Sequence, residues 1–241
     1  MEDYMTIYAN RFSPLFTDRW AKLNESAYFD RVILGDCVKT MEKMPDSCID
    51  FVLTDPPYIT RYTDRQGRQI QNDDNGNWVL PAFKQIYRVL KDDSLCVSFY
   101  GWPHADIFLD AWKRCGFRPV SHLTWVKRSS SRIGYTAGCH ESAYLLAKGN
   151  PSKPSYPPVD VLQYGYSGNK IHPTEKPVSA LKPIIEAYTS PGSLILDPFC
   201  GSGSTGLAAN FCGRHYLLME IDPKYFESAK KRLQLDKPSE Q

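Results

Sequence analysis

Strand-like runs alternate with helix-like segments along most of this chain, and this alternation constrains the fold more than any other feature. The runs are short and rich in β-branched and aromatic residues, whereas the segments between them carry apolar residues at helical spacing. The expected strands are 32–34, 49–53, 95–100, 120–126, 142–147, 193–197 and 216–219, and the expected helices are 37–44, 81–90, 103–115, 177–188, 204–212 and 223–235. Repeated alternation of this kind predicts an α/β fold with a doubly wound, mostly parallel sheet.

Length and composition favour a single domain. A chain of 241 residues suits one α/β domain, which we predict over 1–241 with an aromatic-rich N-terminal arm at 1–28. Residues 149–170 are rich in Pro, Ser, Gly and Tyr and have no period, so we expect a long loop there. The formal net charge is only +2, so any affinity for nucleic acid has to come from local clusters of basic residues.

Neither a membrane span nor a secretion signal is indicated. No run approaches the ~20 apolar residues of a membrane span, and the polar start, Met1-Glu2-Asp3, is unlike a signal peptide. The seven cysteines are scattered without a Cys-x-x-Cys pair, which argues against a zinc knuckle and against a disulfide framework. We therefore expect a cytoplasmic protein with no metal site and no contact with a membrane.

A short acceptor-rich corner, Asp55–Tyr58, ends the expected strand 49–53, and we call it the hook. Its two prolines fix the backbone φ angle and remove two N–H donors. The corner therefore combines the carboxylate of Asp55, the backbone carbonyl of Pro56, the rigid ring of Pro57 and the aromatic ring of Tyr58. Such a group can grip a flat ring by its exocyclic amino group, so we predict that these four residues are catalytic.

A second motif, residues 197–206, lies between an expected strand and an expected helix, and we call it the glycine loop. Gly201, Gly203 and Gly206 have the G-x-G-x-x-G spacing of a dinucleotide site. Glu220 ends the next expected strand, where a ribose-binding carboxylate belongs. On spacing alone, the motif is consistent with the NAD site of a dehydrogenase.

The residues Asp197, Pro198 and Phe199 separate the strand from the first glycine, and they favour a different ligand. In a dinucleotide site the pyrophosphate meets the N-terminus of the helix, and a carboxylate here would repel it. The same carboxylate suits S-adenosylmethionine, which has a cationic amine and a ribose but no phosphate. The chain has no Gly-Lys-Ser/Thr sequence, so a loop for nucleoside triphosphates is also excluded.

These motifs resemble those of the S-adenosylmethionine-dependent DNA amino-methyltransferases, which modify adenine N6 or cytosine N4. The resemblance is carried by Asp55-Pro56-Pro57-Tyr58 and by Asp197-Pro198-Phe199-x-Gly201-x-Gly203. Other blocks of that family match in the same order, namely Gly35-Asp36, Pro45 to Asp50, Trp125-Val126-Lys127, His140-Glu141 and His172 to Pro177.

The order of the two motifs implies a particular version of the methyltransferase fold. The hook precedes the glycine loop, as in the β group of the family, whose chain is a circular permutation of the usual methyltransferase. The resemblance covers about residues 30–235. It implies a Rossmann-like sheet in which the strands that end at Asp55 and Asp197 are neighbours, with the ligands at the point where the strand order reverses.

Several residues are expected to bind the cofactor. Phe199 and the backbone of Gly201, Ser202 and Gly203 should line the methionine and ribose, so a side chain at Gly203 should enter the space of the cofactor. Glu220 should bind the ribose hydroxyls, and Asp36 and Cys37 should meet the adenine, with Asp55 and Asp197 close by. By resemblance, Thr174 and Lys176 would approach the methionine carboxylate. The family often carries Gln where this chain has Glu175, which leaves the role of Glu175 open.

The chemistry of an aromatic amine explains why a methyltransferase needs the hook. The nitrogen is a poor nucleophile because its lone pair is conjugated with the ring. If Asp55 and the Pro56 carbonyl accept its two hydrogens, a pyramidal nitrogen is favoured and its developing positive charge is stabilised. Tyr58 would stack on the base, which has to rotate out of the duplex to enter a pocket. Because an ordinary carboxylate, with a pKa of about 4, is a weak base, Asp55 is assigned mainly an orienting and electrostatic role.

Double-stranded DNA is the partner that the resemblance implies, and a homodimer is one assembly to consider. The candidate DNA-facing loops are 59–78, 128–139 and 149–170. Basic residues that could bind phosphates gather in or beside the first two loops, and they are Arg61, Arg65, Arg68, Lys127, Arg128 and Arg132.

The leading hypothesis is an N6-adenine DNA methyltransferase of the restriction-modification type, because Asp rather than Ser heads the hook. N4-cytosine methylation is the alternative. Methylation of RNA or of a protein amide is less favoured, because related enzymes use Asn in place of Asp55 and have the cofactor loop first. A DNA-binding module without activity is disfavoured by the presence of Asp55, Tyr58 and the intact glycine loop.

Overall fold

A single eight-stranded sheet forms the centre of the protein, in a computed structural model that describes residues 28–63, 67, 70–127, 135–164 and 175–235. The strands are β1 (Arg31–Leu34), β2 (Ile49–Thr54), β3 (Leu90–Phe99), β4 (Arg118–Lys127), β5 (His140–Lys148), β6 (Val161–Tyr164), β7 (Leu194–Asp197) and β8 (His215–Glu220). The helices are α3 (Cys37–Met41), α4 (Val79–Val89), the 3-10 helix η2 (Trp102–His104), α5 (Ala105–Cys115), α6 (Val178–Tyr188), α7 (Ser204–Phe211) and α8 (Pro223–Leu235).

The strand order in the sheet is β1-β8-β7-β2-β3-β5-β4-β6. The first five strands in this order run parallel, β5 runs antiparallel to both β3 and β4, and β6 pairs parallel with β4. The prediction of an α/β fold with a mostly parallel sheet is therefore confirmed.

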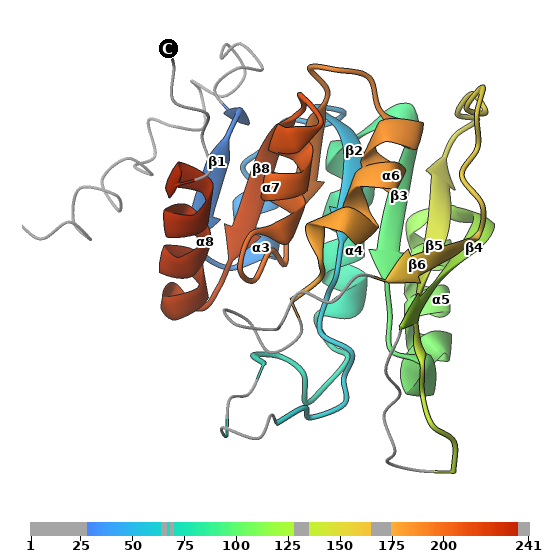
Figure 1. The fold of residues 1–241 in the computed structure, drawn as a ribbon. Helices are drawn as coiled ribbons and strands as arrows, with labels where there is room; N and C mark the ends of the chain where they lie inside the picture. Colours follow the sequence, from blue (N-terminus) through green and yellow to red (C-terminus); the bar gives the residue numbers. More distant parts are fainter. Residues whose placement is uncertain (1–27, 64–66, 68–69, 128–134, 165–174, 236–241) are drawn as a thin grey trace, which may run out of the picture.

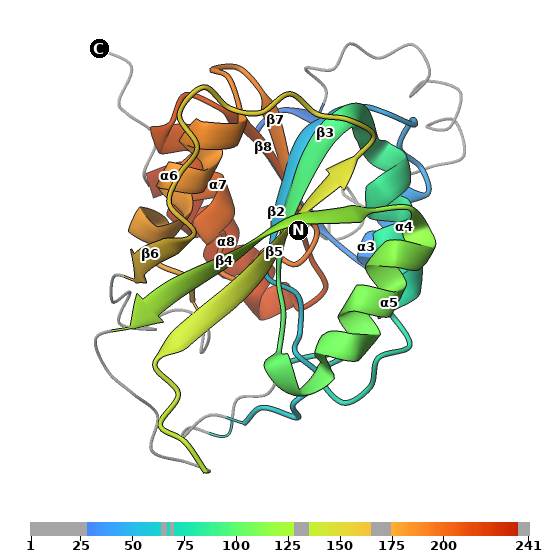
Figure 2. The same cartoon turned by 90° about the vertical axis from the view of Figure 1, so that its right-hand side faces the viewer.

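Helices cover both faces of the sheet and make the protein three-layered (Figures 1 and 2). Helices α3, α4 and α5 lie on one face, and α6, α7 and α8 lie on the other. The central strand β2 is buried on both sides, so its alternate residues enter different cores: Val52 packs in one apolar cluster, and Phe51 and Leu53 pack in the other. This double burial explains why the sequence of β2 is a continuous apolar run.

The strand order reverses between β7 and β2, which pair in register through Phe51 opposite Ile195 and Val52 opposite Leu196. The prediction that the strands leading to Asp55 and Asp197 are neighbours is confirmed. Strand β1 pairs with β8 at the edge of the sheet, and α8 packs back against β1. Ligands of open α/β sheets bind beyond the carboxyl ends of the strands at such a reversal.

Most predicted elements are present with bounds shifted by a few residues, but one prediction is wrong. Residues 161–164, which were predicted to be loop, form β6 and pair with β4 from Thr124 to Lys127. The run Val-Leu-Gln-Tyr is short and follows a stretch rich in proline, and its first residue, Val161, is 53% exposed. Sequence periodicity could not detect a strand that depends on pairing with a distant edge.

Some predictions concern residues outside the described part of the chain. These are the arm up to residue 27, Arg65, Arg68, the segment 128–134 with Arg128 and Arg132, and the segment 165–174 with His172 and Thr174. Within the residues that the structure does describe, none of the helices has the length and apolar character needed to cross a membrane.

Candidate active site

The hook directly follows β2 and packs closely against the turn that follows β3. An ideal Cβ on Gly101 would lie 2.7 Å from Cβ of Tyr58 and 2.9 Å from the Tyr58 carbonyl oxygen. Only glycine fits this contact without displacing the hook. Ile59, the next residue, is buried and has a φ of 63°. A β-branched residue in the left-handed region marks backbone strain, and here it lies immediately beside the predicted catalytic residues.

The two carboxylate oxygens of Asp55 have different partners. The hydroxyl of Tyr58 donates to Oδ1 at 2.7 Å. The ammonium of Lys176, which comes shortly before α6, lies 2.5 Å from Oδ2. The Asp55 side chain is 21% exposed, so it faces the cavity while its orientation is held from behind.

Asp55 belongs to a cluster of alternating charges. Glu141, on β5, lies 3.8 Å from the Lys176 ammonium, and it also pairs with Lys127 on β4. Burial raises the pKa of Asp55, and Lys176 is the strongest influence that lowers it. Burial also opposes ionisation of Glu141, but Lys176 and Lys127 outweigh it and lower the pKa of that carboxyl.

The glycine loop turns sharply between β7 and α7, because Gly201 and Gly203 have φ angles of 52° and 81°. Several of its N–H groups bond within the protein. The amides of Phe199, Cys200, Gly201 and Gly203 donate to Asp197, Met219, Glu220 and Cys200, respectively. A dinucleotide loop presents such N–H groups to pyrophosphate, so these contacts argue against an NAD site.

Asp197 lies beneath the glycine loop and is only 2% exposed. Its carboxylate accepts hydrogen bonds from the hydroxyl of Thr54 at 2.9 Å, from that of Thr205 at 2.6 Å and from the Phe199 amide at 3.1 Å. Burial raises its pKa from 3.8 to about 6. These contacts tie the end of β2 to the start of α7.

Glu220 ends the neighbouring strand, β8, and Asp222 follows it, and the two acids differ in role. Glu220 accepts hydrogen bonds from the amides of Gly201 and Asp222, both at 2.8 Å, and burial raises its pKa to about 7. Asp222 accepts from the amides of Lys224 and Tyr225, at 2.8 and 3.3 Å. This is the contact of a helix N-cap, so Asp222 caps the start of α8.

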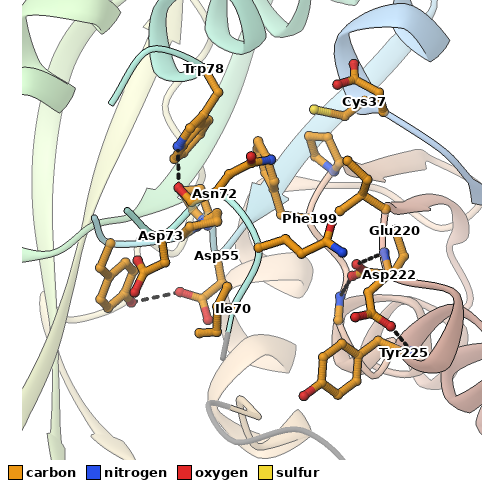
Figure 3. Close-up of a pocket in the computed structure, with 18 of the residues that line it drawn as sticks. Cys37, Asp55, Ile70, Asn72, Asp73, Trp78, Phe199, Glu220, Asp222 and Tyr225 are labelled. Atoms are coloured by element: carbon orange, nitrogen blue, oxygen red, sulfur yellow. Dashed lines mark hydrogen bonds between the residues drawn. The ribbon is translucent and has the colours of Figure 1, made fainter. Parts of the chain in front are cut away.

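The hook and the glycine loop open into one cavity, shown in Figure 3. Asp55 lies on one side and Glu220 on the other, with Phe199 between them. Its empty volume is about 1010 Å³ including the open mouth. The predicted residues that line it are Asp36, Cys37, Asp55, Pro56, Pro57, Tyr58, Phe199, Gly201 and Glu220.

The polar segment after the hook supplies another wall of this cavity. Asp73 is 2% exposed and accepts hydrogen bonds from the Thr60 amide and hydroxyl and from the Tyr62 amide. It thereby closes the segment into a loop. Trp78 donates from its indole N–H to the Asn72 carbonyl at 2.9 Å, and its ring meets the Phe199 ring edge-on at 5.1 Å.

A smaller hollow adjoins this cavity, and Asp55, Phe199 and Gly201 line both. The hollow also contains other predicted residues, namely Lys176, Asp197 and Ser202.

Glu175 also lines the small hollow and forms an ion pair with Arg232 of α8 at 3.0 Å. Arg232 in turn donates to the hydroxyls of Ser202 and Ser204, at 3.1 and 3.2 Å. The acid at position 175 therefore has a partner in this chain, which links the segment before α6 to the glycine loop through α8.

The structure changes the interpretation of two predicted residues. An ideal Cβ on Gly203 would point away from both hollows and lie 3.2 Å from Cβ of Ala229 on α8. This contact gives Gly203 a role in the packing of α8, and the expectation that a side chain there would enter the space of the cofactor stays a prediction. Lys127 was considered for DNA phosphates, and it pairs with Glu141 beside the hook.

Sequence reasoning missed several residues of the site. Trp78, Tyr225 and the residues Ile70, Asn72 and Asp73 line the main cavity, but they belong to no motif. Glu141 and Arg232 are not among the lining residues, but they contact Lys176 and Glu175, which line the small hollow. The pair His140-Glu141 matched a family block, which was a signal for Glu141, whereas nothing local distinguished Arg232 from other basic residues on the closing helix.

Comparison with known proteins gives consistent matches over this part of the chain. A family model for N6/N4 methyltransferases, described as DNA methylase, matches residues 49–170 and 157–231. YubD of Escherichia coli (strain K12), which is described as a methylase, is 50% identical over 84% of this chain and 89% of its own length. The Type II methyltransferase M.HinfI of Haemophilus influenzae is 22% identical over 90% of this chain and 72% of its own length.

Solved structures match the fold. The complex of M1.HpyAVI with S-adenosylmethionine has a TM-score of 0.68 and 23% identity, over 84% of this chain and 98% of that chain. PvuII DNA methyltransferase, described as cytosine-N4-specific, has a TM-score of 0.71 and 21% identity, over 88% of each chain.

Proposed function

Because the chain belongs to the N6/N4 DNA methylase family, we propose that it transfers a methyl group from S-adenosylmethionine to the exocyclic N6 of an adenine flipped out of double-stranded DNA. One observation carries the proposal. The acceptor-rich hook and the acidic side of the glycine loop face each other across a single cavity, so the methyl acceptor and the methyl donor can lie side by side.

The lining of the cavity fits this cofactor. Asp36, Glu220 and Asp222 give one side an acidic character, and Phe199 and Trp78 offer aromatic surfaces. Such a lining suits a cationic ligand with a ribose and a flat ring, and the internal bonding of the glycine-loop amides leaves a poor site for phosphates. When bound, the cofactor supplies an electrophilic methyl group on a sulfonium.

The residues of the hook activate the amine. The Asp55 carboxylate and the Pro56 carbonyl accept the two N–H hydrogens and thereby direct the nitrogen lone pair toward the methyl donor. Pro57 keeps the corner rigid, and Tyr58 stacks on the flipped base. The carboxylate of Asp55 stabilises the positive charge that would develop on the nitrogen as the new C–N bond forms and the S–CH3 bond of the sulfonium breaks, which leaves the cofactor as a neutral thioether. The nitrogen would then lose one proton to solvent, to give the neutral N-methylated base.

In this proposal the cofactor occupies both hollows, with different residues at each end. Glu220 binds the ribose hydroxyls, Asp36 and Cys37 lie near the adenine, and Phe199 with Gly201 covers the centre of the ligand. The small hollow takes the methionine end, with Ser202, Thr174 and Lys176 near its carboxylate. Asp197 supports the loop from below and contributes negative charge near the amine, and Gly203 contributes through packing.

The proposal also places the DNA relative to the cavity. DNA would lie across the mouth of the cavity, with loop 59–78 nearest to the flipped base, because Thr60, Tyr62 and residues 70–73 line the cavity. The segments 128–139 and 149–170 are the other candidate contacts.

The order of hook and glycine loop supports assignment to the permuted β group, in which the break in the chain falls between α8 and β1.

Adenine is favoured over cytosine because Asp heads the hook. The test is to incubate the protein with DNA and methyl-labelled S-adenosylmethionine, digest the DNA and separate the nucleosides. Label in N6-methyladenine is expected. Label in N4-methylcytosine alone would replace the adenine assignment, and the absence of label in DNA would overturn the proposed function.

A further inference from the structure

Lys176 lies behind the hook, and its ammonium contacts the catalytic carboxylate from a buried position. The nitrogen is 2.5 Å from Oδ2 of Asp55, and the Lys176 side chain is 6% exposed. Building on the function proposed above, we propose that Lys176, anchored by Glu141, is a positioning residue that holds Asp55 in its charged, amine-accepting form. The resemblance assigned Lys176 only to the cofactor.

The geometry fixes the carboxylate in one orientation. Lys176 approaches Oδ2, and the hydroxyl of Tyr58 donates to Oδ1, so each oxygen of Asp55 has one donor. An ionised carboxylate can accept about four hydrogen bonds, which leaves acceptor capacity on each oxygen for an N–H group of the substrate. A carboxylate free to rotate would present that capacity in the productive direction only part of the time.

Glu141 lies beside both the lysine and Tyr58. Its Oε2 lies 3.8 Å from the Lys176 nitrogen and 3.2 Å from the hydroxyl of Tyr58, and its other oxygen pairs with Lys127. The Lys176 nitrogen also lies over the Phe99 ring, 4.7 Å from its centroid. Aromatic faces stabilise a cation where water is scarce, so the ammonium has favourable contacts on several sides.

The charges around Asp55 come from every element that packs against it. Lys176 contributes a positive charge from the segment before α6, and Lys127 contributes a second from β4. Glu141 on β5 and Asp197 on β7 contribute negative charges. Burial favours the neutral form of Asp55, and both neighbouring acids do the same. Lys176 is the nearest group that opposes protonation of this carboxylate.

This balance matters for methyl transfer. A protonated Asp55 would lose acceptor capacity and could not stabilise positive charge on the amine nitrogen. Lys176→Gln removes the charge and keeps a polar side chain, whereas Lys176→Arg keeps the charge with a different shape. Lys182→Gln, which alters a lysine on α6 away from the cavity, is the matched control.

The experiment measures turnover against pH for these variants, together with the dissociation constant of S-adenosylmethionine. We expect Lys176→Gln to lower kcat at pH 7 by about 10- to 100-fold and to move the acid limb of the profile upward by at least about one pH unit. Lys176→Arg should restore the position of that limb, and Lys182→Gln should match the parent protein. An unmoved limb, with only weaker cofactor binding, would overturn the proposal.

A second measurement does not depend on activity. The carboxyl carbon of Asp55 can be labelled with ¹³C, identified by its loss in Asp55→Asn and titrated by NMR in the complete chain. In Lys176→Gln its titration should move to higher pH, and an unchanged titration would refute the role of Lys176. Failure of the parent protein to methylate DNA would instead refute the proposed function, so the two failures can be told apart.

Discussion

Asp55 and Asp197 end neighbouring parallel strands and are both shielded from solvent, yet their partners differ in kind. Asp197 accepts from two hydroxyls and an amide, all of which are neutral donors. Asp55 is held by an ammonium and a phenol and keeps one side toward the cavity. Neutral donors hold a carboxyl group in place whatever its charge, whereas an ammonium specifically stabilises the charged form. The comparison separates an acid that holds the site together from one that acts on the substrate.

Replacing each aspartate by asparagine should reveal this difference, and the largest effect on turnover is expected at Asp55. Asp55→Asn removes the charge that the amine needs and brings an amide group against the Lys176 ammonium. We expect kcat to fall by at least about 10³-fold, with binding of S-adenosylmethionine largely retained. Methyl transfer from labelled cofactor and calorimetric titration would measure the two quantities.

Asp197→Asn is the matched control for that experiment. Asn can keep its oxygen toward Thr54 and Phe199 and can donate to Thr205, whose hydroxyl can reverse. Activity should stay within about tenfold of the parent protein. Equal losses of kcat in the two variants would show that the contrast between the two acids is not a functional one.

The pH dependence of stability should sharpen the contrast. The pKa of Asp197 rises from 3.8 to about 6 on folding, so between these values the folded state keeps a proton that the unfolded state has lost. Stability due to this group therefore falls as pH rises from about 4 to about 6. The expected loss is roughly 2 to 3 kcal/mol, since one pKa unit corresponds to about 1.4 kcal/mol.

Urea unfolding at several pH values would measure this dependence. In Asp197→Asn the fall between about pH 4 and pH 6 should be flatter than in the parent protein by that amount. Glu220→Gln is a useful comparison, because the pKa of Glu220 is raised to about 7 and its contribution extends to higher pH. A parent-like slope in Asp197→Asn would mean that Asp197 does not titrate in this range.

Gly101 offers a test on the side of the hook. A methyl group there would meet Cβ and the carbonyl oxygen of Tyr58 at 2.7 and 2.9 Å, so Gly101→Ala should displace the hook. We expect kcat to fall by about tenfold or more, with little change in cofactor affinity. Gly76→Ala is the control, because the methyl group would approach its nearest neighbours, side-chain atoms of Ile107 and Ile59, no closer than 3.3 Å. Similar kinetics for the two variants would argue against precise placement of the hook.

The sequence predicted the elements and both motifs, but it could not predict which contacts each motif makes. Alternation of apolar runs indicates a parallel sheet, and a rigid Pro-Pro corner is a local property. Of the partners of Asp55, Tyr58 is local, but Lys176 comes from the distant segment before α6. Glu141, which lies beside Lys176, comes from β5. The distances between these residues depend on tertiary packing. Resemblance placed Lys176 at the cofactor, whereas the fold brings its ammonium to Asp55. Strand β6 was missed for a related reason, because it is supported by tertiary contacts, namely its pairing with β4 and its packing against α6.

The smallest expected effect concerns the glycine loop and distinguishes packing from cofactor contact. Gly203 and Gly192 both have a φ of 81°, but an ideal Cβ at Gly203 meets Ala229 at 3.2 Å, while at Gly192 it meets nothing within 4 Å. Both alanine variants carry the cost of a left-handed backbone, of order 1 kcal/mol. Gly203→Ala should lose roughly 1 kcal/mol more in urea unfolding, with cofactor affinity changed only slightly. A large loss of affinity with normal stability would show instead that the backbone of Gly203 borders the cofactor.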